Sequence, residues 1–245
     1  MSALNAKHHL LEIELLREKV PSFETYPFSL PVVRNFHSLK PHPGVTFIVG
    51  ENGSGKSTLL EAIAVAWGFN PEGGTRNFNF STRASHSPLC ECLRLSRGAR
   101  RAKDGFFLRA ESFFNVATEI ERLGVTGSYG GVPLHEQSHG EAFLALVMNR
   151  FGGDGLYVLD EPEAALSPMR QLTLLARLHQ LVGARSQFII ATHSPMLLAY
   201  PDADIYQIEN GDLRKVAYEE TTHYIIAKAF LNNPRRQLER LLDGG

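Results

Sequence analysis

Val45-Thr-Phe-Ile-Val-Gly50-Glu-Asn-Gly-Ser-Gly-Lys-Ser57 is the stretch of this sequence that decides the fold. It opens with a short apolar run, which predicts a buried strand of a parallel sheet. Gly50–Ser57 matches the pattern G-x-x-x-x-G-K-[ST] in full, and residues 57–67 beyond it have the apolar spacing of a helix. A strand, a glycine-rich loop and a helix, in this order, predict a phosphate-binding turn in an α/β domain.

The residue types in this loop suit a bound nucleoside triphosphate. Glycines allow backbone N–H groups to point inward around phosphate oxygens, and the helix adds its positive N-terminal end. We expect Lys56 to reach the β and γ phosphates and to serve catalysis, and Ser57 to ligate Mg²⁺. The remaining predicted nucleotide-binding residues of the loop are Gly50, Glu51, Asn52, Gly53, Ser54, Gly55 and Thr58. ATP and Mg²⁺ are therefore the predicted ligands.

Two further buried strands are predicted to end in polar residues. Leu156–Asp160 is an apolar run, and Glu161 follows it directly. Asp160 suits the Mg²⁺ shell, and Glu161 suits the role of general base toward the attacking water. Gln187–Ala191 leads into His193, which we interpret as a catalytic contact of the γ-phosphate; a structural histidine is the alternative. Carboxyl ends of parallel strands bind ligands, so these residues are expected to meet.

The rest of the chain predicts a P-loop α/β fold with a β-rich N-terminal part and a small helical and hairpin insertion. Leu93–Arg97 and Phe106–Ala110 are expected to form a hairpin with the basic tip Gly98–Gly105. Further helices are expected over 113–123, 140–151 and 168–182, a hairpin around 210–211, and a last helix over 222–242 that a proline at 234 could break. We expect one domain, 1–245, with a catalytic lobe of about 1–84 and 141–245 and an insertion lobe of about 85–140.

Composition excludes several protein classes. With 25 basic and 26 acidic residues among 245, the net charge does not indicate a nucleic-acid or membrane partner. Cys90 and Cys92, the two cysteines, are too few for a disulfide framework and have no further zinc ligands nearby. No window approaches the roughly 18 apolar residues of a membrane helix. A soluble, cytoplasmic protein without membrane insertion is expected.

These motifs, in this order, resemble the ABC ATPase superfamily. A fourth segment, Gln137-Ser138-His139-Gly140-Glu141, resembles a variant of the ABC signature L-S-G-G-Q and directly precedes an apolar helix. In the family, this helix start binds the γ-phosphate of ATP held by the other subunit. The resemblance therefore implies that Ser138 and Gly140 bind nucleotide across an ATP-dependent homodimer. A plain helix N-cap is the alternative for these residues.

Within the superfamily the chain resembles the soluble SMC/RecF-like "AAA family ATPase" branch. Residues 34–37 resemble its N-F-R-S segment, and residues 161–168 its E-P-E-x-x-L-H-P segment. No glutamine occurs between residues 59 and 136, so the family's Q-loop glutamine is missing and its replacement is unidentified. Only 81 residues lie between Lys56 and Ser138, which leaves no room for a coiled coil. The resemblance implies an ATPase in DNA repair, genome maintenance or defence; a transporter's ATP-binding subunit and a weakly hydrolysing switch are the alternatives.

Weaker signals concern other ligands. The basic residues Arg94, Arg97, Arg100, Arg101 and Lys103, with Arg109 beyond them, could contact nucleic-acid phosphates, or could simply cover a solvated hairpin tip. Phe78 and Phe80 fit a stacking platform or, more simply, buried strand positions. Phe36 and Tyr26 are the candidate seats for adenine, which the sequence does not separate.

Overall fold

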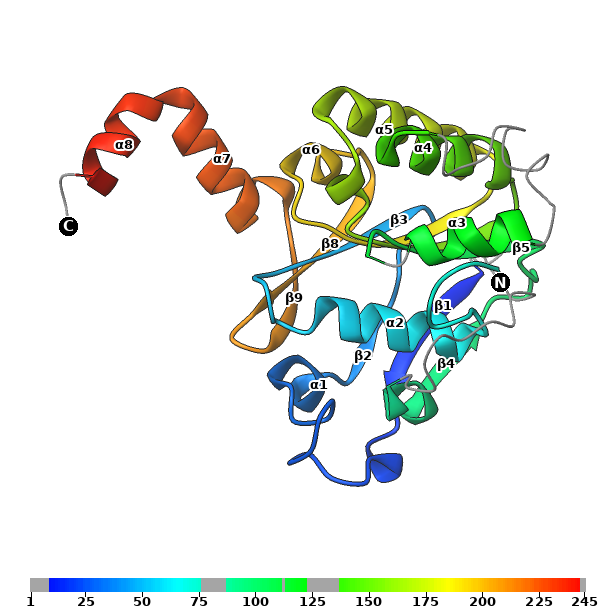
Figure 1. Ribbon diagram of the computed structural model, residues 1–245. Helices are drawn as coiled ribbons and strands as arrows, with labels where there is room; N and C mark the ends of the chain where they lie inside the picture. Colours follow the sequence, from blue (N-terminus) through cyan, green and yellow to red (C-terminus); the bar gives the residue numbers. More distant parts are fainter. Residues whose placement is uncertain (1–8, 76–86, 112, 123–136, 243–245) are drawn as a thin grey trace.

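A computed structural model of the chain describes residues 9–75, 87–111, 113–122 and 137–242 (Figure 1). The strands are β1 (Leu10–Leu15), β2 (Ser38–Leu39), β3 (Val45–Val49), β4 (Leu93–Arg97), β5 (Asp104–Arg109), β6 (Gly155–Asp160), β7 (Gln187–Ala191), β8 (Ala203–Glu209) and β9 (Asp212–Val216). The α-helices are α1 (Pro31–Asn35), α2 (Lys56–Trp67), α3 (Phe113–Arg122), α4 (His139–Arg150), α5 (Pro168–Gly183), α6 (Pro195–Leu198), α7 (Thr222–Asn232) and α8 (Pro234–Leu242). Phe78 and Phe80, the candidate stacking or buried strand positions, lie outside the described residues.

The main sheet has the strand order β5-β6-β7-β3-β8-β9. Neighbouring strands from β5 through β8 run parallel, and β9 runs antiparallel to β8. β3, which leads into the predicted phosphate loop, lies inside the sheet between β7 and β8. This order places the carboxyl ends of β3, β5, β6 and β7 along one edge of the sheet, as the α/β prediction requires.

Every residue of β3, β6 and β7 is buried, and these strands are mostly apolar because both of their faces are covered. In β3, Phe47 packs with α3, α4, α5 and α6 on one face, whereas Ile48 packs with α2 and the N-terminal elements on the other. The same alternation divides Tyr157 from Val158 in β6. Figure 1 shows the resulting layers, with α4 and α5 on one side of the sheet and α2 on the other. One apolar core on each face of the sheet therefore fixes the strands, and with them the loops that follow their carboxyl ends.

A second sheet, with the order β2-β1-β4, covers α2 on its outer side. Its existence shows that the hairpin predicted from Leu93–Arg97 and Phe106–Ala110 is wrong. β4 pairs antiparallel with β1, and β5 pairs parallel with β6 in the main sheet. The physical reason is burial. Phe106 and Phe107 are fully buried on opposite faces, which a two-stranded hairpin cannot achieve but an interior sheet can.

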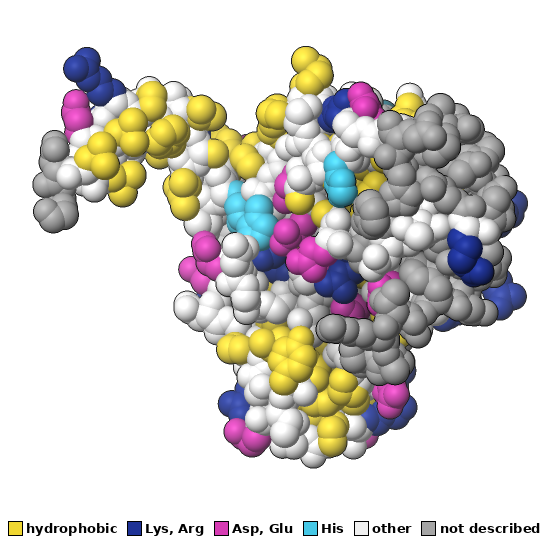
Figure 2. Space-filling view, viewed as in Figure 1, with side chains coloured by type: hydrophobic (Ala, Val, Ile, Leu, Met, Phe, Trp, Pro, Cys, Tyr) yellow, Lys and Arg dark blue, Asp and Glu magenta, His cyan; other side chains and the backbone are white. Residues whose placement is uncertain are grey.

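The chain ends in an arm of two helices, α7 and α8, which together form residues 222–242 and separate at Pro234 as predicted. This arm extends away from the rest of the molecule (Figure 1) and has no buried residue in either helix. Apolar side chains gather along it (Figure 2); Ile226 is 62% exposed and Leu231 76% exposed. Among the described residues, no helix has both the length and the apolar character needed to cross a bilayer.

Candidate functional site

The glycine-rich loop joins β3 to α2 at the carboxyl edge of the sheet. Gly53 and Gly55 have φ angles of +78° and +93°, a region that side chains with a Cβ rarely adopt. A Cβ at Gly55 would also lie 2.6 Å from Cγ1 of Val32. Both glycines are therefore required by the turn itself, and α2 begins at Lys56, with Gly55 as its N-cap. The predicted strand, loop and helix are confirmed.

Lys56 is held inside this turn and is only 4% exposed. Its Nζ donates hydrogen bonds to the carbonyl oxygens of Gly50, at 2.7 Å, and Glu51, at 2.9 Å. Burial lowers the pKa of the Lys56 ammonium, and the nearby Glu161 and Asp160 carboxylates oppose that shift. The loop thus holds the buried ammonium group of Lys56 toward the space that the loop surrounds.

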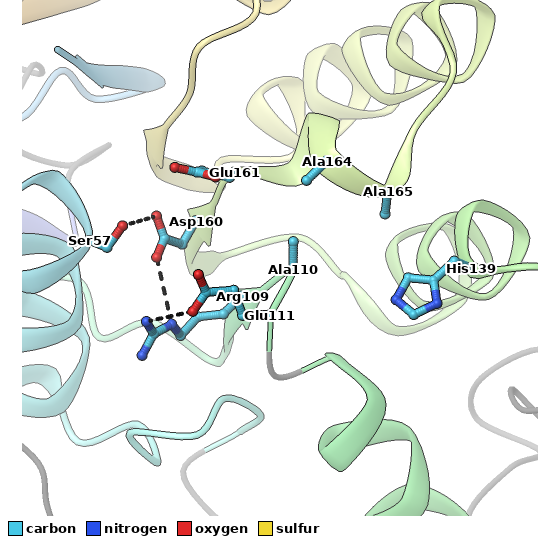
Figure 3. Close-up of a pocket in the computed structure, with 9 residues that line it drawn as sticks. All are labelled: Ser57, Arg109, Ala110, Glu111, His139, Asp160, Glu161, Ala164 and Ala165. Atoms are coloured by element: carbon cyan, nitrogen blue, oxygen red, sulfur yellow. Dashed lines mark hydrogen bonds and ion pairs between the residues drawn. The ribbon is translucent and has the colours of Figure 1, made fainter. Parts of the chain in front are cut away.

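The loop and the acidic strand end meet directly. Oγ of Ser57, in the first turn of α2, donates a hydrogen bond of 3.1 Å to Oδ1 of Asp160 at the end of β6 (Figure 3). Asp160 is 5% exposed, and burial raises its pKa to about 6. These two hard oxygen donors suit Mg²⁺, which in nucleotide sites is bound by one or two protein groups together with phosphates and water. A hydroxyl of the loop, Ser54 Oγ, is buried without a hydrogen-bond partner among the described residues, as fits a group that contacts a ligand.

Arg109, at the end of β5, was not predicted as part of this site. The register of β5 and β6 places it directly beside Asp160, and its Nε lies 3.6 Å from Oδ2 of that carboxylate. Its Nη1 donates to Oε2 of Glu61 at 2.7 Å. The guanidinium opposes the effect of burial on Asp160 and so favours the ionised carboxylate. Arg109 and Glu111 line a cavity of about 240 Å³ with Ser57, Asp160, Glu161 and His139 (Figure 3).

Glu161 has an unusual backbone conformation. Its φ of +50° and ψ of 52° lie in the left-handed region, which is uncommon for a residue with a side chain. Its N–H donates to the carbonyl oxygen of Ala191 at 2.9 Å, so the turn after β6 is fixed to the end of β7. Such strain persists where the surroundings impose it, and it aims the Glu161 carboxylate into the cavity shown in Figure 3.

His193 follows β7 and lies beside Glu161. Its Nε2 is 3.5 Å from Oε1 of Glu161, and its backbone N–H donates to Oε1 of Glu163 at 2.5 Å. Its other ring nitrogen, Nδ1, is 3.0 Å from Nε2 of His223. His223 belongs to α7, and nothing in its sequence neighbourhood indicated a role. The structure thus brings Lys56, Ser57, Asp160, Glu161 and His193 together at one edge of the sheet.

Ser138 and Gly140 lie at the start of α4 and make different contacts. Oγ and N of Ser138 donate to Oε2 of Glu141, at 2.5 and 3.1 Å, and Arg170 pairs with Oε1 of Glu141 at 2.9 Å. The hydrogen bonds described for Ser138 therefore run within the helix start and to Arg170, and none runs to loop 50–58 of the same chain. His139, between the two, lines the cavity beside Asp160.

The predicted basic cluster is largely engaged within the chain. Arg94 pairs with Glu14, Arg97 lies over the Trp67 ring at 4.4 Å, and Arg100 and Lys103 pair with Asp154 at 2.9 and 3.7 Å. Arg101 is exposed. The cluster is therefore a set of local ion pairs and stacking contacts more than an open row of cations.

The two candidate seats for adenine differ in exposure. Phe36 is 4% exposed and belongs to the core, so its ring is not available to a ligand. Tyr26 is 69% exposed, and its OH lies 3.5 Å from Oγ1 of Thr58 at the end of the loop. The structure favours Tyr26.

Two family models and one curated protein match parts of this chain. A family model described as "AAA domain" matches residues 23–106, and one described as "AAA domain, putative AbiEii toxin, Type IV TA system" matches residues 92–199. Over 77 residues the chain is 39% identical to the DNA replication and repair protein RecF of Idiomarina loihiensis. That match covers 29% of this chain and 22% of the relative, so only a small part of the relative's length is represented.

Among solved structures, the chain is similar to a putative metal-chelate type ABC transporter in an inward-facing conformation. The two are 14% identical, with 90% of this chain and 88% of that chain covered and a TM-score of 0.50. The SMC head domain from Thermotoga maritima is 17% identical, with 85% and 98% covered and a TM-score of 0.47. The likeness to the transporter chain is one of fold, and it agrees with the predicted α/β architecture.

Proposed function

We propose that this chain, a member of the ABC-type AAA ATPases, binds Mg-ATP with Gly50–Thr58 and hydrolyses it at the carboxyl edge of β3, β6 and β7. The observation that carries the proposal is the 3.1 Å hydrogen bond between Ser57 and Asp160. It joins the phosphate loop to the acidic strand end, two motifs 103 residues apart in the chain.

The loop binds the triphosphate through its backbone and through Lys56. The N–H groups of the turn and the first turn of α2 face the phosphate oxygens, and the helix dipole favours their negative charge. Lys56 exchanges its two carbonyl partners for oxygens of the β and γ phosphates. Tyr26, exposed beside Thr58, offers an aromatic face to the adenine ring.

Ser57 and Asp160 would hold Mg²⁺ between them and the phosphates. The ion supplies charge neutralisation on the β and γ phosphate oxygens. Arg109 keeps Asp160 ionised for this role despite its burial, because its guanidinium opposes the raised pKa of that carboxyl. Glu61 in turn fixes Arg109.

Glu161 acts as the general base and His193 as a γ-phosphate contact. The Glu161 carboxylate lines the cavity and is 39% exposed, so a water molecule can reach it and give up a proton. His193 lies against the same carboxylate and positions a ring nitrogen toward the terminal phosphate. Both side chains depend on the turn that joins Glu161 to Ala191.

A second copy of the chain would complete the site. Ser138 and Gly140 have no contact with the phosphate loop of their own chain in the described contacts. Ser138 is exposed, and the N-terminus of α4 that it caps attracts anions. We infer that they face the γ-phosphate held by a partner copy. Arg170 neutralises Glu141 at this helix start, which reduces repulsion of that phosphate.

The cellular process is DNA repair, genome maintenance or defence. Support comes from the RecF match over 77 residues and from the family description that mentions a putative AbiEii toxin. A nucleic-acid partner would contact the exposed Arg101, with Arg94, Arg97, Arg100 and Lys103, which make contacts within the chain, beside it.

Glu161→Gln tests the proposal. It removes the base while leaving the backbone turn intact, so hydrolysis should slow by about 10²–10⁴-fold with ATP still bound. The variant should then be a dimer with ATP and a monomer without it, as measured by light scattering. Glu18→Gln is the control. It makes the same change from carboxylate to amide at an exposed residue in the turn after β1, and it should behave as the wild type.

A mixing experiment tests the shared site. Ser138→Arg chains and Lys56→Ala chains are each expected to be inactive, and their mixture should regain activity through one intact site per heterodimer. A Glu161→Gln variant that stays monomeric at saturating ATP would disprove the dimer. Wild-type protein that binds ATP without turnover would indicate a switch in place of an ATPase.

A further inference from the structure

His193 and His223 form a pair whose members come from distant parts of the chain. His193 follows β7, and His223 is the second residue of α7. Nδ1 of His193 and Nε2 of His223 are 3.0 Å apart, a hydrogen-bond distance. A single proton must lie between them, because two neutral imidazoles can share only one N–H at such a contact. The question is which ring carries it.

The outer nitrogens of the two rings answer that question. Nε2 of His193 lies 3.5 Å from the Glu161 carboxylate, an ion-pair distance, and both this nitrogen and Nδ1 of His223 are buried without a hydrogen-bond partner among the described residues. If His223 carries the bridging proton, its buried Nδ1 is a bare acceptor and His193 holds its own proton on Nε2. That N–H then faces the negative charge of Glu161.

The opposite assignment is unfavourable at both ends. A bridging proton on His193 would leave its Nε2 lone pair against the Glu161 oxygen, which is repulsive. It would also place a buried N–H on Nδ1 of His223 with no acceptor beside it among the described residues, whereas an N–H on Nε2 of His193 faces the Glu161 carboxylate. Burial lowers the pKa of His223, with the neighbouring His193 acting in the same direction, so the ring is neutral as this arrangement needs.

The start of α7, which carries His223, is held by β8, the strand next to β3. The backbone N–H of Thr222 donates to Oε1 of Gln207 at 3.0 Å, and Oγ1 of Thr221 accepts from N of Tyr224 at 3.3 Å. Gln207, in β8, lies opposite Val49, the residue before the loop. The hydrogen bond to Gln207 therefore joins the start of α7 to the strand beside the phosphate loop.

We propose that His223 is a positioning residue: it donates its Nε2 proton to Nδ1 of His193 and so holds that ring with Nε2–H directed at Glu161 and the nucleotide. The functional consequence of this inference rests on the proposed ATP hydrolysis, because the N–H on Nε2 of His193 would donate to the γ-phosphate of ATP. The groups facing this pair are Glu161, Glu163, Glu51 and Lys56. His223 thereby also links the site to the C-terminal arm, residues 222–242.

The bridging proton is tested directly by ¹⁵N NMR of the nucleotide-free protein, at about pH 8, above the ordinary histidine pKa of about 6.5. Coupling between the two ring nitrogens across the hydrogen bond, with the proton attached to Nε2 of His223, is expected. His193→Gln assigns the signals. A bridging proton attached to Nδ1 of His193, or no coupling between the rings, would overturn the assignment, and neither result depends on ATP turnover.

Two variants test the consequence for hydrolysis. His223→Leu removes the donor and should lower kcat about 10–100-fold with KM and the melting temperature nearly unchanged, the usual effect of losing a residue that orients another. His223→Gln keeps an N–H donor at a similar reach and should retain kcat to within about threefold. His179→Leu is the matched control, since His179 contacts Tyr200 away from the site.

The outcomes separate this inference from the proposed function. If the wild type hydrolyses ATP and His223→Leu matches it in kcat, His223 does not position His193. If His223→Gln loses as much activity as His223→Leu at an unchanged melting temperature, the proposal that His223 acts by donating a proton to His193 is wrong. A wild type without turnover would count against the proposed ATPase, while the NMR measurement would still decide the proton's place.

Discussion

Gly140→Ala is a change whose effect follows from the geometry at the start of α4. A Cβ at Gly140 would lie 2.6 Å from the carbonyl oxygen of Ala165 and 2.6 Å from Nη1 of Arg170. Ordinary contacts of a Cβ begin at 3.4 Å. Ala165 closes the short 3-10 turn after Glu161, so its backbone oxygen cannot move away freely. The start of α4 must therefore shift by roughly 0.8 Å, with Ser138 on it.

Gly183→Ala is the matched control, because a Cβ there meets nothing within 4 Å. Both variants gain the helix preference of alanine over glycine, so their difference isolates the steric clash. Overpacking costs about 1–3 kcal/mol. For a protein of this size that corresponds to a melting temperature roughly 2–12 °C lower for Gly140→Ala than for Gly183→Ala.

The activity of the two variants completes the test. A displacement near 1 Å in a catalytic arrangement costs on the order of 10²-fold, so Gly140→Ala should lose most ATP hydrolysis while each chain still binds nucleotide. Differential scanning calorimetry, nucleotide titration and phosphate release measure the three quantities. If Gly140→Ala melts within about 1 °C of Gly183→Ala, the close approach of α4 to Ala165 is refuted.

Three further changes test other parts of the structure. Lys56→Ala should abolish ATP binding in a fluorescent-nucleotide titration without unfolding the chain. If the variant binds ATP as tightly as the wild type does, the assignment of residues 50–57 as a phosphate loop is wrong. Asp154→Asn should destabilise the protein near neutral pH: the Arg185 hydrogen bond holds the pKa of Asp154 at about 2, below its ordinary 3.8. The stabilising effect of that carboxylate is present above about pH 4 and is lost as the pH falls toward 2, so wild-type and variant melting temperatures should converge there. Arg101→Glu should weaken duplex or single-strand DNA binding and flatten its salt dependence, and absence of binding by the wild type at low salt would exclude nucleic acid.

Much of the site could be predicted because its chemistry is local in sequence. Gly50–Ser57, Asp160 and His193 each follow an apolar run, and an apolar run of five residues is enough to indicate a buried parallel strand. The rule that such strands end at one edge then brings the residues together without knowledge of the strand order. The structure confirms that convergence.

The residues that were missed depend on pairings that no short segment reveals. Arg109 follows a buried strand like the others, but β5 was assigned to a hairpin with β4, so its place beside Asp160 was hidden. The signal was present in Phe106 and Phe107, whose burial on both faces suits the main sheet. His223 lies early in a helix that follows a hairpin, and only the docking of α7 on Gln207 brings its ring to His193.

The interior position of β3 also sets the order in which the chain can fold during synthesis. Val45 pairs with Phe188 on one side and Ala203 on the other, so its partners leave the ribosome 143 and 158 residues after it. At about 5–20 residues per second, the later partner emerges roughly 8–30 s after Val45. Until then an apolar strand with two open edges has no sheet to join, and such edges invite wrong pairing. Translation speed between residues 45 and 203 therefore sets how long this apolar strand waits for its second partner.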